Sequence, residues 1–224
     1  MAFLANIVND ENGATEYVEQ FLDPLLRIHD ESLRGVFRNA HNHRMGDGFG
    51  QRPRILDVGG GSGAPLALAF GRTGMLLETV DFATPHPILA INFNMMSFKA
   101  DLSEPNALGE LDAAGCGRAV VISNRTLRYL SNACDLVRQM IEKTDPGGVI
   151  AFDYLDAPRE TEIHEYTAPM LGMKCPVFAH PRESFHDLAA QYGATVIPEL
   201  DKEIYPYEYE CEMDEVPPAL LHAG

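Results

Sequence analysis

Residues 54–65 read RILDVGGGSGAP and decide the fold expected for this chain of 224 residues. The apolar residues around Asp57 predict a buried strand that ends at Val58. The glycines after it predict a tight turn, because glycine adopts positive φ and lets a ligand approach the backbone without meeting a Cβ. Pro65 suits the first turn of a helix. The exposed N–H groups of such a helix start attract a nucleotide-like ligand, so the stretch predicts a cofactor site.

Two cofactor patterns fit this stretch. Residues 59–64 match the dinucleotide pattern G-x-G-x-x-G/A, and Asp81 lies about 20 residues further on, as that pattern expects. The same letters, read as D-x-G-x-G-x-G from Asp57 to Gly63, resemble the first motif of the class I S-adenosylmethionine (SAM) methyltransferases. Asp57 discriminates between them, because a carboxylate at the turn suits the positively charged amino group of SAM. SAM is therefore the expected cofactor, and an NAD-dependent oxidoreductase is an alternative.

Composition narrows the class of partner. Hydrophobic residues make up 46% of the chain and charged residues 22%, as in an ordinary globular protein. The formal charge of −16 argues against nucleic acid as a partner and favours a small-molecule substrate. No apolar run is long enough to cross a membrane, and the start has no secretory pattern. Four scattered cysteines without a C-x-x-C pair indicate neither a metal site nor a disulfide framework, and a cytoplasmic location is expected.

Strand-like and helix-like runs alternate after the glycine turn, as in a parallel α/β sheet. The expected strands cover 55–58, 75–80, 97–100, 119–123 and 149–154. The helices between them are expected to start at Ala64, Thr84, Pro105 and Leu130. Before the turn, residues 14–44 have helical periodicity and predict an N-terminal helical lid.

The last third of the chain follows a different pattern. Residues 156–181 show no clear periodicity and are expected to form an irregular connection, followed by a short helix over 184–192. Strand-like runs over 194–200 and 203–213 then predict an antiparallel hairpin, which is typical of the methyltransferases and not of the dehydrogenases. The resemblance thus implies a seven-stranded, mostly parallel, doubly wound α/β sheet with a C-terminal antiparallel hairpin. The expected organisation is a helical cap over 1–50, a methyltransferase domain over 51–215 and a tail over 216–224.

The resemblance also implies which residues hold the cofactor. Asp81, at the end of the second strand, would accept hydrogen bonds from the ribose hydroxyls, and Phe82 would lie near the adenine ring. Asp101 would accept the adenine amine, with the Leu102 backbone N–H facing a ring nitrogen. Each aspartate also has a purely structural interpretation, as the cap of the following helix. The full set expected around the cofactor is Asp57, Gly59, Gly60, Gly61, Gly63, Asp81, Phe82, Asp101, Leu102, Ser123 and Asn124.

The loop after the fourth strand is expected to line the substrate side of the site. Arg125 or Arg128 could bind an anionic substrate group, or could be an arginine paired with a nearby carboxylate. Methyl transfer needs the nucleophile aligned with the methyl group, and an oxygen nucleophile also gains from a general base. His41, His43 and Tyr129 are the main candidates, and Arg128 and Tyr129 stand where the family often has a histidine. The remaining candidate bases are His29, His164, His180 and His186.

The sequence thus predicts a SAM-dependent methyltransferase that acts on an O or N atom of a small molecule. Because no base stands out, a methyltransferase-like domain that has lost catalysis and serves as a binding or scaffold protein is an alternative. The chain could form a homodimer, and the sequence does not decide this.

Overall fold

The computed structural model describes residues 53–61, 63, 66–67, 71, 75–82, 95–111, 118–124, 126–168 and 173–196. The expected N-terminal lid, the helix at Thr84 and the tail lie outside these residues. The expected C-terminal hairpin is described only at 194–196, where no strand forms, and the helix expected at Ala64 only at 66–67. The chain divides into two compact units. The first comprises residues 1–124 and 139–151, and the second comprises residues 125–138 and 152–224.

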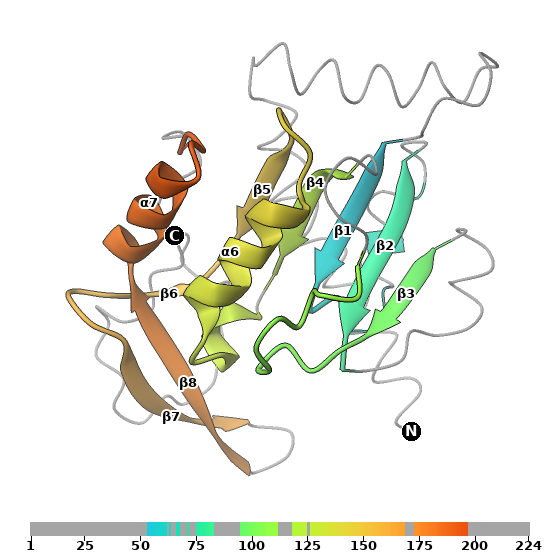
Figure 1. The fold of residues 1–224 in the computed structure, drawn as a ribbon. Coiled ribbons are helices and arrows are strands. Elements are labelled where there is room, and N and C mark those ends of the chain that lie inside the picture. Colours follow the sequence, from blue (N-terminus) through green and yellow to red (C-terminus); the bar gives the residue numbers. More distant parts are fainter. Residues whose placement is uncertain are drawn as a thin grey trace, which may run out of the picture. The chain divides into compact units, whose positions relative to one another are not determined.

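A five-stranded sheet organises the first unit (Figure 1). Its order is β3-β2-β1-β4-β5, and β1 pairs in parallel with both β2 and β4, as β2 does with β3. Each expected strand is confirmed to within two residues at either end. The strands are β1 Arg54–Val58, β2 Leu76–Asp81, β3 Met96–Lys99, β4 Arg118–Ser123 and β5 Val149–Phe152.

The central strands form the core of this unit. Ile55, Leu56 and Val58 of β1 are fully buried, and so are residues 120–122 of β4. Near-continuous apolar runs of this kind are typical of parallel strands that are covered on both faces. The carboxyl ends of β1, β2 and β4 lie at one edge of the sheet, where open α/β sheets bind their ligands.

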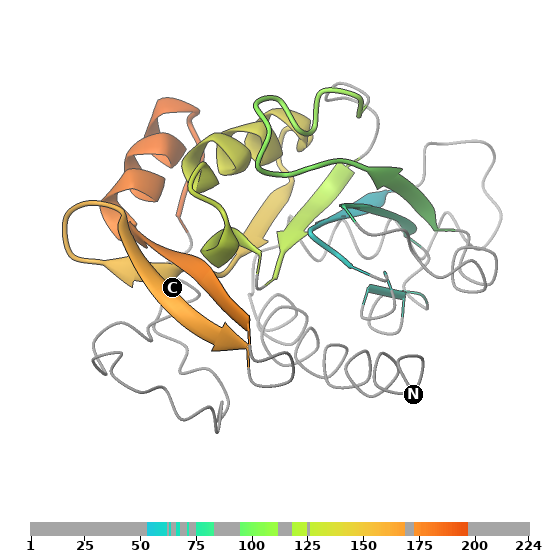
Figure 2. The same ribbon diagram turned by 90° about the horizontal axis from the view of Figure 1, so that it is seen from below.

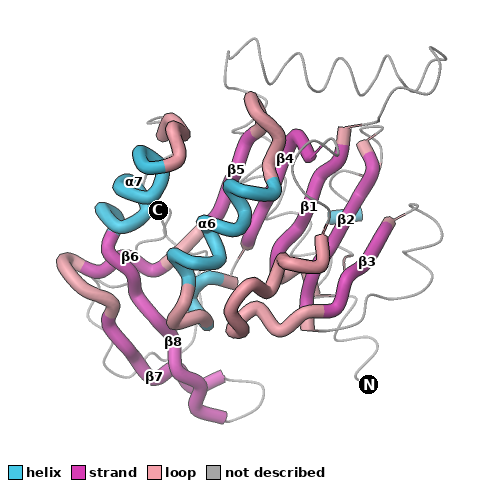
Figure 3. The backbone as a smooth tube through the Cα atoms, viewed as in Figure 1, coloured by secondary structure: helices cyan, strands magenta, loops and turns pink. Residues whose placement is uncertain are grey.

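Residues 101–111, here called the post-β3 turn segment, correct one prediction. The helix expected from Pro105 does not form, and Figure 3 draws the segment after β3 as loop. Asn106 has φ 60°, a left-handed conformation that interrupts a right-handed helix. Successive turns replace the helix, with Glu104 N donating to Asp101 O (3.1 Å) and Gly109 N to Asn106 O (2.8 Å).

Helices follow β4 and the small sheet. A short 3-10 helix, η2 (Leu127–Tyr129), comes first, so α6 begins at Ala133 (Ala133–Lys143) and not at Leu130 as predicted. The short helix expected over 184–192 is confirmed as α7 (Arg182–Gln191).

The second unit contains a sheet that the sequence did not predict. Instead of an irregular connection, residues 155–181 form β6 (Leu155–Ala157), β7 (Glu162–Ala168) and β8 (Met173–Pro181), in the order β6-β8-β7. β7 pairs antiparallel with β8, and the two lie side by side in Figure 2. β8 contains Pro176, which has no N–H to give to the ladder. The strand forms nevertheless, with Val177 and Ala179 in a buried cluster with Leu155 and Ala157.

In the part of the chain that the structure describes, no helix is long and apolar enough to span a membrane. The same residues contain no group of three or more His, Cys, Asp or Glu side chains that could hold a metal ion.

Candidate functional site

The glycine turn, residues 59–63, leaves β1 at the carboxyl edge of the sheet. Gly59, Gly61 and Gly63 have φ of 85°, 54° and 74°, values that a residue with a Cβ rarely adopts. Gly59 N donates to Val80 O (2.8 Å) and extends the contact with β2 by one residue. Gly63 N donates to Gly60 O (2.9 Å), which closes the turn. The backbone path predicted from the glycines is therefore the one that forms.

Asp57 and Thr79 lie beneath this turn. They face each other in the register of β1 and β2, and both side chains are fully buried. A Cβ added to Gly60 would overlap the Thr79 hydroxyl oxygen and would come within 2.5 Å of Asp57 Oδ2. The turn thus needs glycine at position 60 for close packing. Asp57 is therefore enclosed beneath the turn, and its contact with a ligand amino group stays a prediction.

Asp81 connects the end of β2 to the glycine turn. Its Oδ2 accepts a hydrogen bond from Gly61 N (2.9 Å), and the side chain is part-buried. A hydrogen bond to a carboxylate is stronger than one between neutral groups, so this contact holds the turn against β2. Among the described residues, a Cβ at Gly61 would meet nothing within 4 Å.

Phe82 follows Asp81 and is 69% exposed, an unusual degree for a phenylalanine. The Lys99 ammonium group, from the end of β3, lies over its ring, 5.5 Å from the centroid. A cation–π contact of this kind helps to orient the ring. A place for Phe82 near an adenine ring stays a prediction.

Asp101 is an exposed residue that opens the post-β3 turn segment. Its Oδ1 accepts hydrogen bonds from the Ser103 hydroxyl (2.6 Å) and the Ser103 backbone N–H (3.0 Å). These two bonds, the hydroxyl first, hold the pKa of Asp101 below its usual value and keep it ionised. Leu102 beside it is buried. Part of the structural interpretation is therefore observed, since Asp101 caps its own turn, while Oδ2 has no partner among the described residues.

The end of β4 is tied to the end of β1. The buried Ser123 hydroxyl donates to the Val58 carbonyl (2.9 Å) across the two strands. Asn124 follows and is half-buried. Both residues reach the expected edge, and contact with the methionine end of a cofactor stays a prediction for them.

The second unit holds Arg128 and Tyr129. Arg128 forms a mostly buried ion pair with Asp153, with 2.6 Å between Nη2 and Oδ2. This is the paired-arginine alternative that the sequence left open, and substrate binding by Arg128 stays a prediction. Tyr129 is 47% exposed in η2. His41, His43 and Arg125 lie outside the described residues.

His180 is a buried histidine of the second unit. Its Nε2 lies 3.0 Å from the Leu130 carbonyl oxygen and its Nδ1 3.3 Å from the Thr161 hydroxyl. Because a carbonyl only accepts, Nε2 carries the hydrogen and Nδ1 faces the hydroxyl. Burial lowers the pKa of His180, and hydrogen bonds to the carbonyls of Leu130 and Leu127 oppose part of that shift. His180 is 1% exposed, so it connects Leu130 and Thr161 inside the fold and is not accessible as a general base.

The first unit therefore brings together most of the residues predicted around the cofactor. Ala100 N donates to Asp81 O (3.0 Å), which links the strand ends that carry Asp81 and Asp101. Thr79, Lys99 and Ser103 also belong to this edge, and the sequence did not indicate them. Parallel pairing of β1 with β2 would have placed Thr79 opposite Asp57, and the Asp-x-Ser spacing is a known local hydrogen-bonding pattern.

Comparison with protein families agrees with this geometry. Residues 29–199 match the family model described as methyltransferase domain, which is more than half of the chain. No curated protein matches the sequence.

Solved structures with a similar fold include methyltransferases from several organisms. The Burkholderia thailandensis 1,6-didemethyltoxoflavin-N1-methyltransferase, solved with 1,6-didemethyltoxoflavin and S-adenosylhomocysteine, is 17% identical with a TM-score of 0.51, and the match covers 94% of this chain and 83% of that one. A SAM-dependent methyltransferase from Mesorhizobium loti is 14% identical, with a TM-score of 0.45 and coverages of 72% and 80%. The Haemonchus contortus phosphoethanolamine N-methyltransferase 2, solved with SAM, is 16% identical, with a TM-score of 0.42 and coverages of 70% and 36%.

Proposed function

Since the chain belongs to the methyltransferase domain family, we propose that it transfers a methyl group from SAM to an oxygen or nitrogen atom of a small molecule. One observation carries the proposal: the glycine turn is bonded to Asp81 through Gly61 at an open sheet edge that also bears Asp101. A dinucleotide would also use Asp81, but the family match and the fold both favour the methyltransferase interpretation over the NAD-dependent one.

The residues present at this edge fit SAM. Among the described residues nothing lies within 4 Å of a Cβ built on Gly61, which lets a ligand approach the backbone there. The Asp81 carboxylate is an acceptor-only group of the kind that binds ribose hydroxyls, and Asp101 is ionised with Oδ2 available to an amine. Phe82 offers an exposed aromatic face beside them. A nucleoside needs these three kinds of contact, to ribose, to the exocyclic amine and to the ring.

SAM, when bound, supplies a methyl group on a positively charged sulfur, which is a good leaving group. The chain's own residues bind and orient the two reactants, and alignment alone accounts for a large part of the acceleration that such enzymes achieve. In the proposed roles, Asp81 binds the ribose and Asp101 binds the adenine amine. The glycine turn lets the ligand lie against the protein backbone. Tyr129 and the histidines outside the described residues stay as candidate bases.

A small-molecule substrate is supported by charge. With 33 acidic and 17 basic residues the chain has little to attract a polyanion. The structural relative from Burkholderia thailandensis was solved with a small heterocyclic substrate, which agrees with this class.

Calorimetric titration of the purified full-length chain tests the proposal. We expect S-adenosylhomocysteine, the product form of the cofactor, to bind with one site per chain, and NAD+ not to bind under the same conditions. Adenosine serves as the matched control, because it contains the ribose and adenine without the amino-acid portion, and it should bind more weakly.

The opposite outcomes are equally clear. Binding of NAD+ without S-adenosylhomocysteine would contradict the proposal and favour an oxidoreductase. Binding of neither ligand would favour the non-catalytic scaffold. If S-adenosylhomocysteine binds, incubation with SAM carrying a labelled methyl group and a panel of small amines, phenols and carboxylic acids will identify the acceptor class by mass spectrometry.

A further inference from the structure

Asp101 can recognise an amine only if the turn segment that carries it has one conformation. The segment contains no helix or strand, and such segments usually vary more than the elements around them. Its start is anchored, because Ala100 N donates to Asp81 O at the ends of β3 and β2. Ser103 orients the carboxylate by binding Oδ1 twice. What holds the far end, at residues 108–111, therefore matters for recognition.

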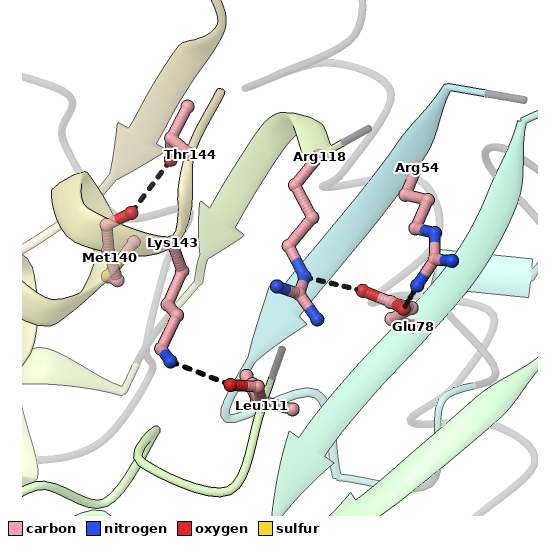
Figure 4. A network of polar contacts seen from close by, with 7 residues as sticks. All are labelled: Arg54, Glu78, Leu111, Arg118, Met140, Lys143 and Thr144. Carbon is pink, nitrogen blue, oxygen red and sulfur yellow. Dashed lines mark hydrogen bonds and ion pairs between the residues drawn. The ribbon is translucent and has the colours of Figure 1, made fainter. Parts of the chain in front are cut away.

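The far end is held by one face of α6. The Gln139 side-chain carbonyl accepts a hydrogen bond from the Leu108 backbone N–H (2.9 Å), across 31 residues of sequence. Lys143, four residues further along the same helix, donates to the Leu111 carbonyl oxygen (2.7 Å), as Figure 4 shows. Residues four apart in a helix lie on the same face, so the two bonds act together. They attach α6 to both sides of the turn from Leu108 to Leu111.

Burial makes the Gln139 contact specific. Gln139 is 2% exposed, Leu108 is fully buried and Leu111 is 4% exposed. The local turns use the N–H groups of Gly109 and Leu111, so that of Leu108 depends on Gln139. A buried donor that loses its acceptor costs the full desolvation penalty. The segment would have to rearrange if this acceptor were removed.

On these contacts we propose that Gln139 is a positioning residue for adenine recognition, because it fixes the turn segment from which Asp101 presents Oδ2 to the exocyclic amine. The inference rests on the proposed function, since it assumes that the ligand is SAM. Gln139 touches neither ligand nor reacting atoms in this scheme. It acts through Leu108 and the segment, in support of Ser103.

The test compares two ligands that differ at one edge of the purine. S-inosylhomocysteine has a carbonyl oxygen where S-adenosylhomocysteine has the amine, and a hydrogen on the adjacent ring nitrogen. The ratio of their dissociation constants therefore reports recognition of this edge by Asp101 and by the Leu102 N–H, both of which the turn segment carries. Calorimetry on the wild-type chain should give a preference for S-adenosylhomocysteine of roughly tenfold or more, the scale of a charged hydrogen bond. Gln139→Met keeps the size and removes the acceptor. It should lower that preference to about threefold or less, mainly by weakening S-adenosylhomocysteine.

The matched control is Met140→Ala, the next residue of the same helix. Met140 is fully buried, so truncation creates a cavity and lowers the melting temperature, but its side chain makes no hydrogen bond to the segment among the described residues. We expect the ligand preference to survive in this variant. If Gln139→Met does not fold, Lys143→Met replaces it, with an expected twofold to threefold loss of preference on the scale of one ordinary hydrogen bond.

Each result decides the inference. An unchanged preference in Gln139→Met, or an equal loss of affinity for both ligands, would overturn it and leave Gln139 as a purely structural residue. A wild-type chain that binds both ligands equally would overturn the inference too, while leaving SAM as the proposed cofactor. Failure of the wild-type chain to bind S-adenosylhomocysteine at all is a different outcome, because it removes the proposed function itself.

Discussion

Two carboxylates of one strand, Glu78 and Asp81, have opposite surroundings. Near the amino end of the sheet, Glu78 is fully buried and accepts hydrogen bonds from Arg54 Nη1 (2.8 Å) and Arg118 Nε (2.6 Å), as Figure 4 shows. Three residues later, Asp81 accepts a backbone N–H from Gly61 at an open edge. Glu78 is thus bound by two charged side chains, whereas Asp81 is part-buried and holds the backbone of the glycine turn. In the proposed function Asp81 also binds the ligand, and Glu78 has a structural role alone.

The difference follows from what each environment can satisfy. A buried carboxylate needs opposite charge and hydrogen bonds to compensate its lost hydration, and Arg118, itself fully buried, needs the same in return. Asp81 is only part-buried, so its carboxylate keeps more of its hydration, and in the proposed function it also binds the ligand. Substitution of Glu78 should therefore mainly lower the stability of the fold, and substitution of Asp81 should mainly lower the affinity for the ligand.

The largest effect is expected for Glu78→Gln. Removing the charge leaves two arginines, one of them fully buried, without their partner, and the free energy of unfolding should fall by about 3–5 kcal/mol. Urea unfolding followed by circular dichroism measures the loss. Glu165→Gln is the control, because the Glu165–Lys174 pair is exposed and its loss should leave the unfolding curve unchanged. A Glu78 variant as stable as the wild type would remove the contrast between the two ends.

Gly60→Ala should affect both stability and binding. The new Cβ overlaps Thr79 and Asp57, both fully buried, so the turn must shift, at a cost of about 1–3 kcal/mol in stability. Affinity for S-adenosylhomocysteine should fall because the shifted turn bears the ligand-facing backbone. Gly61→Ala is the comparison, since its Cβ meets no neighbour in the described part of the chain and only the positive φ is strained. Greater stability loss in Gly61→Ala than in Gly60→Ala would contradict the packing argument.

Asp81→Ala should show the opposite pattern to Glu78→Gln, with a larger loss of ligand affinity and a smaller loss of stability. Removing the part-buried carboxylate takes away its contacts to ligand and to Gly61, and binding of S-adenosylhomocysteine should weaken by about 1–3 kcal/mol. Calorimetry measures this, and thermal unfolding of the same sample should change less than in Glu78→Gln. Unchanged affinity would remove Asp81 from the binding site.

The smallest effect concerns His180 in the second unit. Its pKa is lowered by burial from the ordinary value of 6.5, so the unfolded chain takes up a proton at a higher pH than the folded chain does. The contribution of neutral His180 to the free energy of unfolding is therefore fully present above about pH 6.5, and it is lost as the pH falls toward the lowered pKa. His180→Gln keeps an N–H donor for Leu130 but does not titrate. The melting temperature of this variant should fall less than that of the wild type between about pH 7.5 and pH 5.5. An equal fall in both would exclude His180 as a source of the pH dependence of stability.

Sequence reasoning succeeded where local pattern and backbone chemistry coincide. The apolar runs predicted the five strands of the first unit, because strands buried on both faces need continuous apolar sequence. The glycines predicted the turn, because its positive φ values exclude most other residues. It failed at residues 155–181, where the local sequence shows no clear periodicity and pairing between β7 and β8 decides the structure. It failed again at Pro105, where the left-handed Asn106 ends any helix.

By itself, then, the sequence determined the strand and glycine turn at the start of the site, the positions of the first five strands along the chain and the family. Tertiary structure decided that Glu78 is enclosed by two arginines, because only the register of β1, β2 and β4 places Arg54 and Arg118 around it. It also brought Gln139 to Leu108 from 31 residues away. Such contacts depend on how elements pack, and no residue's own propensity encodes a partner that far along the chain.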